Sequence, residues 1–123
     1  MLIIPVQRDE LFPALERGLG DLAAANLTVT KNRLEQVDFS DPLVTGVSEL
    51  VVTGPAGPEL RSLDDLAGRE VHVRRSSSYW RSLEKLNDDL QRRGLKPVEM
   101  APAEEFLQDE DLLEMVNAGL LPT

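Results

Sequence analysis

The sequence contains no cysteine, and only 4% of its 123 residues are aromatic. The absence of cysteine excludes disulfide bonds, thiolate zinc sites and cysteine nucleophiles. Hydrophobic residues nevertheless make up 41% of the chain, so we expect a core built mostly from aliphatic side chains. The length suits one ordinary domain or two very small lobes.

Basic residues are also scarce, with 13 lysines and arginines against 22 acidic residues and a net charge of −9. So acidic a protein repels phosphate backbones and anionic lipid surfaces, and nucleic acid is therefore not an expected partner. No apolar run approaches the roughly 20 residues that span a bilayer. The opening "MLIIPVQRDE" lacks the basic segment of a signal peptide, so any export signal is expected outside this chain.

Signals for catalysis are missing as well. The single histidine, His72, lies in the middle of a strand pattern, where a structural role is the ordinary one, and no second histidine can complete a triad. The serines at 76–78 lie in no nucleophile-elbow pattern, and the acidic run "QDEDLLE" lacks the EF-hand spacing. Carboxylates can pair in space for glycoside chemistry, but no particular pair stands out. We therefore predict a non-enzymatic chain with no cofactor and no metal.

Strand patterns alternate with helix patterns along the chain, which predicts an α/β fold with largely parallel strands. Expected strands lie at 2–7, 21–30, 47–54, 69–73 and 96–101. Expected helices lie at 9–17 after an Asp9 cap, at 31–36 after a Thr30 cap, around 62–68, and at 78–93. A last helix is expected to start at a capping box formed by Asp111 and Glu114 and to end before Gly119.

Two of these segments carry informative side-chain patterns. Alternation over 21–30 places Ala23, Ala25, Leu27 and Val29 on one face, while the other face becomes polar toward its C-terminal end, where open α/β sheets bind ligands. The helix at 78–93 has an apolar stripe of Trp80, Leu83, Leu86 and Leu90. Its polar face predicts ion pairs between Asp88 and Arg92 and between Asp89 and Arg93.

The segment "GPAGPE" at 54–59 has the composition of a linker and separates two parts of the chain. We expect residues 1–53 to belong to one lobe, 54–60 to a hinge region and 61–123 to a second lobe. A weak internal echo between "LFPALERGL" (11–19) and "LLEMVNAGL" (112–120) agrees with two similar lobes. The second copy stops where its strand should begin, which suggests a truncated domain.

Arg33 lies in the first turn of the helix expected after Thr30, where a cation opposes the helix dipole. Its position is understandable if an anion shares the site, with Thr28 and Asn26 supplying neutral hydrogen bonds. The alternative is a surface arginine paired with Glu35 or Asp38.

The stretch "HVRRSSSYW" repeats this arrangement, because Arg74 and Arg75 follow a strand and Ser76, Ser77 and Ser78 open a helix. Serines cap helices without any ligand, and that alternative stays open. Two such sites on opposite sides of 54–59 outline a cleft between lobes that would hold a ligand bearing carboxylates.

Several motifs resemble the type 3 extracellular solute-binding proteins, whose pattern has a T-x-T-x-x-R run, V-D-F-S-x-P, and D-L-x-G-x-x-V-x-V. The matching residues are Gly18, Asp21, Thr28, Thr30, Arg33, 37–40, Pro42, Asp65, Leu66, Gly68, Val71 and Val73. Within the family, "AAANLTVT", "REVHVRRSSSYW" and "EDLLEMVNAGLLP" are most similar to the solute-binding domain of MltF-type membrane-bound lytic murein transglycosylases. There the binding domain precedes a separate lysozyme-like catalytic domain.

The resemblance implies a two-lobed, hinged clamshell of the periplasmic-binding-protein type, truncated so that both lobes are incomplete. It also implies a ligand site made of Asn26, Thr28, Arg33, Arg74, Ser76, Ser77 and Ser78. Asn26 replaces the usual glycine, and Leu43 follows Pro42 where many receptors have an aromatic residue. These departures count against an ordinary amino acid as the ligand. A muropeptide or a cell-wall peptide carboxylate is the alternative.

The expected function is a ligand-sensing domain of a periplasmic or outer-membrane-associated lytic enzyme. A periplasmic amino-acid receptor of an ABC transporter, a dehydratase-like enzyme on the same scaffold, and an interaction module without ligand are the alternatives. Because incomplete lobes leave sheet edges exposed, a homodimer formed by strand exchange is a further expectation.

Overall fold

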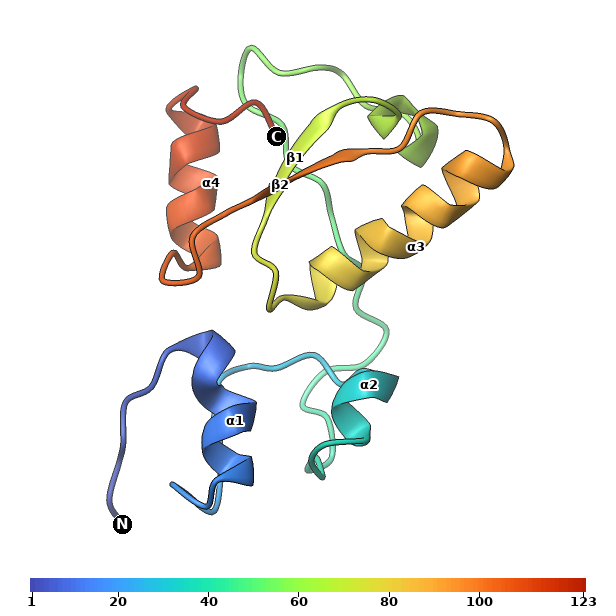
Figure 1. Cartoon of the computed structure of the whole chain (residues 1–123). Helices are drawn as coiled ribbons and strands as arrows, with labels where there is room; N and C mark the ends of the chain where they lie inside the picture. The colour runs from blue at the N-terminus through green and yellow to red at the C-terminus, as the bar shows by residue number, and fades with distance from the viewer. The chain divides into compact units, whose positions relative to one another are not determined.

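The computed structural model describes residues 1–123, which divide into two compact units, Met1–Ser48 and Glu49–Thr123. The first unit contains the 3₁₀-helix η1 (Arg8–Glu10) and the helices α1 (Leu11–Glu16) and α2 (Lys31–Leu34) (Figure 1). The second unit contains η2 (Leu63–Leu66), β1 (Glu70–Val73), α3 (Ser78–Arg92), β2 (Glu99–Pro102) and α4 (Asp109–Asn117). No helix is long and apolar enough to cross a membrane.

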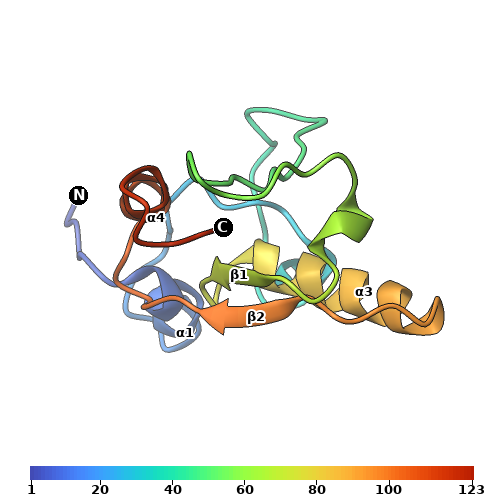
Figure 2. The same cartoon turned by 90° about the horizontal axis from the view of Figure 1, so that it is seen from above.

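The centre of the second unit is a βαβ arrangement. Strands β1 and β2 are parallel, with Glu70 opposite Glu99 and Val73 opposite Pro102, and α3 is the crossover between them. Helices α3 and α4 flank the two strands on opposite sides (Figures 1 and 2). The predicted α/β class with parallel strands is therefore confirmed.

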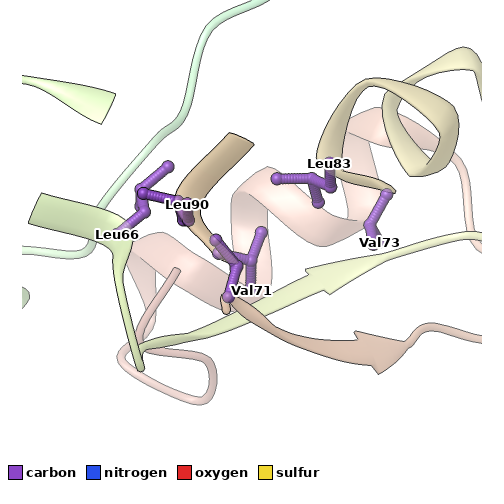
Figure 3. Packing of buried hydrophobic residues seen from close by; sticks show 6 residues of the cluster. Leu66, Val71, Val73, Leu83 and Leu90 are labelled. Atoms are coloured by element: carbon purple, nitrogen blue, oxygen red, sulfur yellow. The ribbon is translucent and has the colours of Figure 1, made fainter. Parts of the chain in front are cut away.

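The core of this unit lies between β1 and α3. Alternation in β1 buries Val71 and Val73 on one face, and the α3 stripe buries Leu83 and Leu90 against them. Leu66 of η2 completes the group in Figure 3, which also includes Val98. Trp80 and Leu86 pack on the cluster as half-buried neighbours, so the predicted stripe is confirmed.

The polar face of α3 forms one of the two predicted ion pairs. Arg93 pairs with Asp89 at 3.2 Å, as expected from i,i+4 spacing. Arg92 also pairs with Asp89, at 3.2 Å, and contacts Asp88 only through the backbone carbonyl, so the predicted Asp88 pair is wrong. Both guanidinium groups reach the same carboxylate because i,i+3 neighbours are as close as i,i+4 neighbours on a helix.

Arg93 also pairs with Asp64 and thereby ties α3 to η2. The hydrogen bond from Arg93 holds the pKa of Asp64 below its ordinary value and raises the pKa of Arg93. A carboxyl group with a lowered pKa stabilises the folded state above its unfolded pKa of about 3.9. That contribution is lost as the pH falls through the lowered value.

The three longer helices all end in the way that the internal echo suggested, and for α3 the residues are Gly94, with φ of 74°, and Leu95, whose N–H donates to Leu90 O at 2.9 Å. Gly18 after α1 and Gly119 after α4 both have positive φ, at 71° and 73°. In each case the residue after the glycine bonds back five residues, Leu19 N to Ala14 O and Leu120 N to Met115 O, both at 2.9 Å. This is the Schellman arrangement, in which a left-handed C′ residue favours glycine. The echo thus reflects a shared helix ending.

The chain around Gly54 packs tightly against the end of α4. Gly54 N donates to Pro122 O at 3.3 Å, and a Cβ at Gly54 would lie 2.7 Å from Val116 O. Glycine is therefore required for this close approach. At the C-terminus, Thr123 O accepts a hydrogen bond of 3.1 Å from the backbone N–H of His72, a residue of β1. The C-terminal residues thus lie beside β1.

Three predicted strands, at 2–7, 21–30 and 47–54, do not form. No segment of the chain pairs with them, and strands need hydrogen-bonded neighbours. Residues 21–28 still alternate, with Ala23, Ala25 and Leu27 half-buried and the positions between them exposed. The side-chain pattern was therefore correct, but a pattern alone does not provide a partner strand.

Two predicted caps are also wrong. Asp9 lies inside η1, and neither η1 nor α1 has a side-chain cap. Helix α4 begins at Asp109, so Asp111 occupies the third helical position, and its Oδ2 accepts from Gln108 N at 2.7 Å. The earlier start places three acidic residues in the first turn, where the helix dipole favours negative charge.

Candidate functional site

Arg33 is held in the first unit by contacts from three segments. Thr30 is the N-cap of α2, as predicted, and its Oγ1 accepts from Arg33 N at 3.4 Å. The guanidinium of Arg33 donates to Thr28 O at 2.9 Å, and its Cζ lies 5.3 Å from the ring centroid of Phe12. Burial, followed by the charge of Arg8, lowers the pKa of Arg33. A half-buried guanidinium of this kind favours an anion.

The backbone conformation at position 26 explains why asparagine replaces the glycine of the family pattern. Its φ is 46°, the left-handed region that glycine adopts freely and that asparagine tolerates better than most residues. The backbone at this position therefore requires glycine or a close substitute, and the turn ends any strand over 21–30. Asn26 O accepts from Arg8 at 3.4 Å.

Neither Arg8 nor Phe12 was among the predicted site residues. Arg8 is 18 residues from the carbonyl that it contacts, and Phe12 is 21 residues from Arg33, so only tertiary folding brings these side chains to the segment. The sequence carries no spacing signal for either contact.

In the second unit the three serines have different roles. Ser77 is the buried N-cap of α3, since its Oγ accepts from Trp80 N at 3.3 Å and donates to Arg74 O at 2.7 Å. Ser78 is the first residue of α3. The capping interpretation therefore describes Ser77, whose hydroxyl is used within the fold.

Ser76 holds a carboxylate. Its backbone N–H donates to Glu105 Oε1 at 3.1 Å, and its hydroxyl donates to Glu105 Oε2 at 2.6 Å. Glu105 comes from the turn between β2 and α4, 29 residues away. Two donors from one residue on the two oxygens of one carboxylate form a clamp suited to this group.

Arg74 is also used internally. Its side chain is 2% exposed, pairs with Asp109 at the start of α4, and donates to Leu107 O at 2.8 Å. Arg75, the next residue, is exposed, and its Cζ lies 4.7 Å from the Trp80 ring centroid. Of the two arginines, the buried one fastens the 105–109 segment to the end of β1.

An α/β fold with carboxylate-binding groups at a strand end and at a helix start is typical of small-ligand binding domains. The sequence pattern of the bacterial extracellular solute-binding proteins, family 3, matches residues 1–121. The chain belongs to this family. Its members have the α/β fold of periplasmic binding proteins and are generally non-catalytic.

Several relatives carry a more specific name. The chain is 40% identical over 88 residues to a membrane-bound lytic murein transglycosylase F of Desulfosudis oleivorans, covering 66% of this chain and 18% of the relative. A protein of the same name from Shewanella pealeana is 34% identical over 116 residues, which cover 92% of this chain and 22% of the relative. The resemblance to this group is therefore confirmed.

A second kind of relative is a probable histidine-binding protein of Neisseria gonorrhoeae, which is 40% identical over 58 residues. The match covers 47% of this chain and 21% of that protein. This chain thus spans about a fifth of the length of the curated relatives it matches. No solved structure matches it.

Proposed function

We propose that this chain is a non-catalytic ligand-sensing domain of a periplasmic lytic transglycosylase and binds a small carboxylate-bearing ligand, such as a muropeptide or an amino acid. The half-buried Arg33, held by Thr28 and Phe12, carries the proposal. Any cell-wall lytic activity then belongs to another part of the parent protein. The transglycosylase relatives support this assignment.

Each unit supplies its own carboxylate-binding group under this proposal. In the first unit these residues are Asn26, Thr28 and Arg33. In the second unit the proposed residues are Arg74, Ser76, Ser77 and Ser78, of which Arg74 and Ser77 also have side-chain partners within the fold. The Ser76 clamp supports a carboxylate ligand because it already holds one, that of Glu105.

Replacing Arg33 with alanine is expected to weaken ligand binding by about 10- to 100-fold, since hydrogen bonds to charged groups contribute about 1.5 to 3 kcal/mol. Isothermal titration calorimetry with N-acetylmuramoyl tripeptide and with free amino acids measures the loss. Arg17→Ala is the matched control, because Arg17 is exposed and pairs with Glu10 at 2.9 Å. Equal ligand affinities of the Arg33→Ala variant and the wild type would show that the site assignment is wrong.

Glu105 is expected to compete with the ligand's carboxylate for Ser76. Glu105→Gln removes the charge that Ser76 now holds and should tighten binding of a carboxylate ligand by several-fold. Glu104→Gln is the control, since Glu104 is exposed and its replacement removes the same charge one residue away from Glu105. Calorimetry of both variants measures the change in ligand affinity. Weaker binding by Glu105→Gln would show that Glu105 contacts the ligand instead.

A periplasmic amino-acid receptor of an ABC transporter is the second candidate, and the match to a probable histidine-binding protein favours it. The same titrations separate the two functions. Histidine or another free amino acid would bind more tightly than the muropeptide in a receptor, and the muropeptide would bind more tightly in a regulator of a lytic enzyme.

We also propose that two copies of the chain associate by strand exchange. Apolar residues of the segments predicted as strands are exposed, among them Leu2 at 85%, Ile3 at 77% and Leu50 at 84%. Unpaired strands with apolar side chains are sites of intermolecular pairing. Native mass spectrometry should find a species of twice the 13.6 kDa chain mass, and a purely monomeric spectrum would contradict this.

A further inference from the structure

Arg74 and Arg75 are neighbours at the end of β1 but lie in opposite environments. Arg74 is 2% exposed, pairs with Asp109 and donates to Leu107 O at 2.8 Å, so its charge is engaged within the fold. Arg75 is exposed and forms no ion pair. The cation that faces solvent beside the Ser76 clamp is therefore Arg75, which was not among the predicted ligand-binding residues.

The guanidinium of Arg75 is held in place and keeps its hydrogen-bond donors. Its Cζ lies 4.7 Å from the ring centroid of Trp80, and a cation–π contact uses none of the five N–H donors. The ring itself is fixed, because its Nε1 donates to Glu84 Oε1 at 3.1 Å and the side chain packs on the core cluster. A guanidinium placed in this way loses less side-chain entropy on binding an anion than a freely rotating one does.

A carboxylate already occupies the position next to Arg75 in the chain. Glu105 accepts from Ser76 N at 3.1 Å and from Ser76 Oγ at 2.6 Å, before the start of the 15-residue helix α3, where the helix dipole favours negative charge. Glu105 forms no ion pair with Arg75. A ligand carboxylate that replaces Glu105 on Ser76 can therefore gain a charge pair that Glu105 itself lacks.

The acidic surroundings of the clamp also call for a cation. Residues 104–114 include six acidic residues and no basic one, and this segment supplies Glu105 and Asp109 to the contacts at the end of β1. These charges repel an approaching carboxylate. Because Arg74 is paired with Asp109, the positive charge that offsets the repulsion comes from Arg75.

We propose that Arg75 binds the carboxylate of the ligand in the second unit, beside the Ser76 clamp. The planar guanidinium donates two hydrogen bonds to the carboxylate, in the manner of an arginine fork. The inference rests on the proposed function and deepens it, because it adds a ligand-binding residue to the site of this unit. The class of ligand is unchanged, an amino acid or a peptide with a carboxylate.

Arg75→Gln tests the inference in calorimetric titrations of the full chain with N-acetylmuramoyl tripeptide and with L-histidine. The variant should bind the probe that the wild type prefers about tenfold or more weakly, since a hydrogen bond to a charged group is lost. Its affinity should also depend less on salt concentration, because a charge pair is missing. Arg75→Lys keeps the charge without the fork, so it should retain the salt dependence and part of the affinity.

Arg69→Gln is the matched control. Arg69 is exposed, donates to Asp65 O at 2.6 Å and precedes β1, so the same charge is removed at the opposite end of the strand. This variant should bind both probes as the wild type does. Circular dichroism and urea unfolding of each variant show that it is folded.

Wild-type affinity in Arg75→Gln, an equal loss in Arg69→Gln, or an unchanged salt dependence would overturn the inference. Failure of the proposed function has a different signature, since the wild type would then bind neither probe. A loss with Arg33→Ala but none with Arg75→Gln keeps the proposed function and refutes the role of Arg75. A loss with Arg75→Gln alone keeps this inference and shows that the Arg33 assignment is wrong.

Discussion

Replacing Leu90 with alanine is expected to lower the free energy of unfolding of the Glu49–Thr123 unit by about 2 to 5 kcal/mol. Leu90 is 0% exposed and lies in the cluster of β1, η2 and α3 side chains. Truncating it removes buried methyl groups and leaves a cavity that the neighbouring backbone cannot close completely. Because a whole protein is stable by only about 5 to 15 kcal/mol, this loss removes a large fraction of the stability.

Urea denaturation followed by the fluorescence of Trp80 measures this effect. Trp80 is the chain's single tryptophan and packs against the same cluster, so its emission reports on this unit. Leu113→Ala on α4 is the control. Its side chain is 47% exposed, and surface truncations usually change stability by less than about 0.5 kcal/mol. Equal losses in the two variants would mean that the cluster is not the core.

Arg74→Ala is expected to destabilise the same unit by about 1 to 3 kcal/mol. The side chain is 2% exposed, and its removal leaves Leu107 O without its donor and frees the start of α4 from β1. The full penalty of a broken buried ion pair, about 3 to 5 kcal/mol, does not apply because Asp109 is 42% exposed and can be hydrated. Lysine at this position lacks the planar fork and should rescue only part of the loss.

The experiment also decides the role of Arg74 in binding. Arg75→Ala is the matched control for stability, since Arg75 is exposed and loses only a cation–π contact of about 0.5 to 1 kcal/mol. An Arg74 variant that is as stable as the wild type but binds N-acetylmuramoyl tripeptide more weakly would establish direct ligand contact. A variant that is destabilised but binds normally at low temperature would limit Arg74 to positioning the 105–109 segment.

The local features of both units were predictable from their sequence. The stripe of α3, the alternation of β1, the cap at Thr30 and the glycine endings depend on residues within one or two turns of each other. Such interactions are nearly independent of the remaining fold. Boundaries were less predictable, as at α4, where the acidic first turn moved the start of the helix to Asp109.

The segments 2–7, 21–30 and 47–54 were predicted to be strands but are not, so here local pattern did not determine the structure. Their apolar and alternating residues indicate extended chain, and the alternate burial of Ala23, Ala25 and Leu27 agrees with that indication. A strand, however, is completed by hydrogen bonds to a neighbour that may be far away in sequence. At Asn26 a single left-handed residue also turns the chain away from a regular strand.

The sequence by itself determined the family, the residue types of the candidate site and the helices that present them, because motifs and periodicity are encoded locally. Only the tertiary structure decided which of those side chains are used within the fold. It buries Arg74 against Asp109, places Glu105 on Ser76 and brings Arg8 to the carbonyl group of Asn26. These contacts join residues 18 to 35 positions apart. Contacts over such distances depend on packing, and no local spacing encodes them.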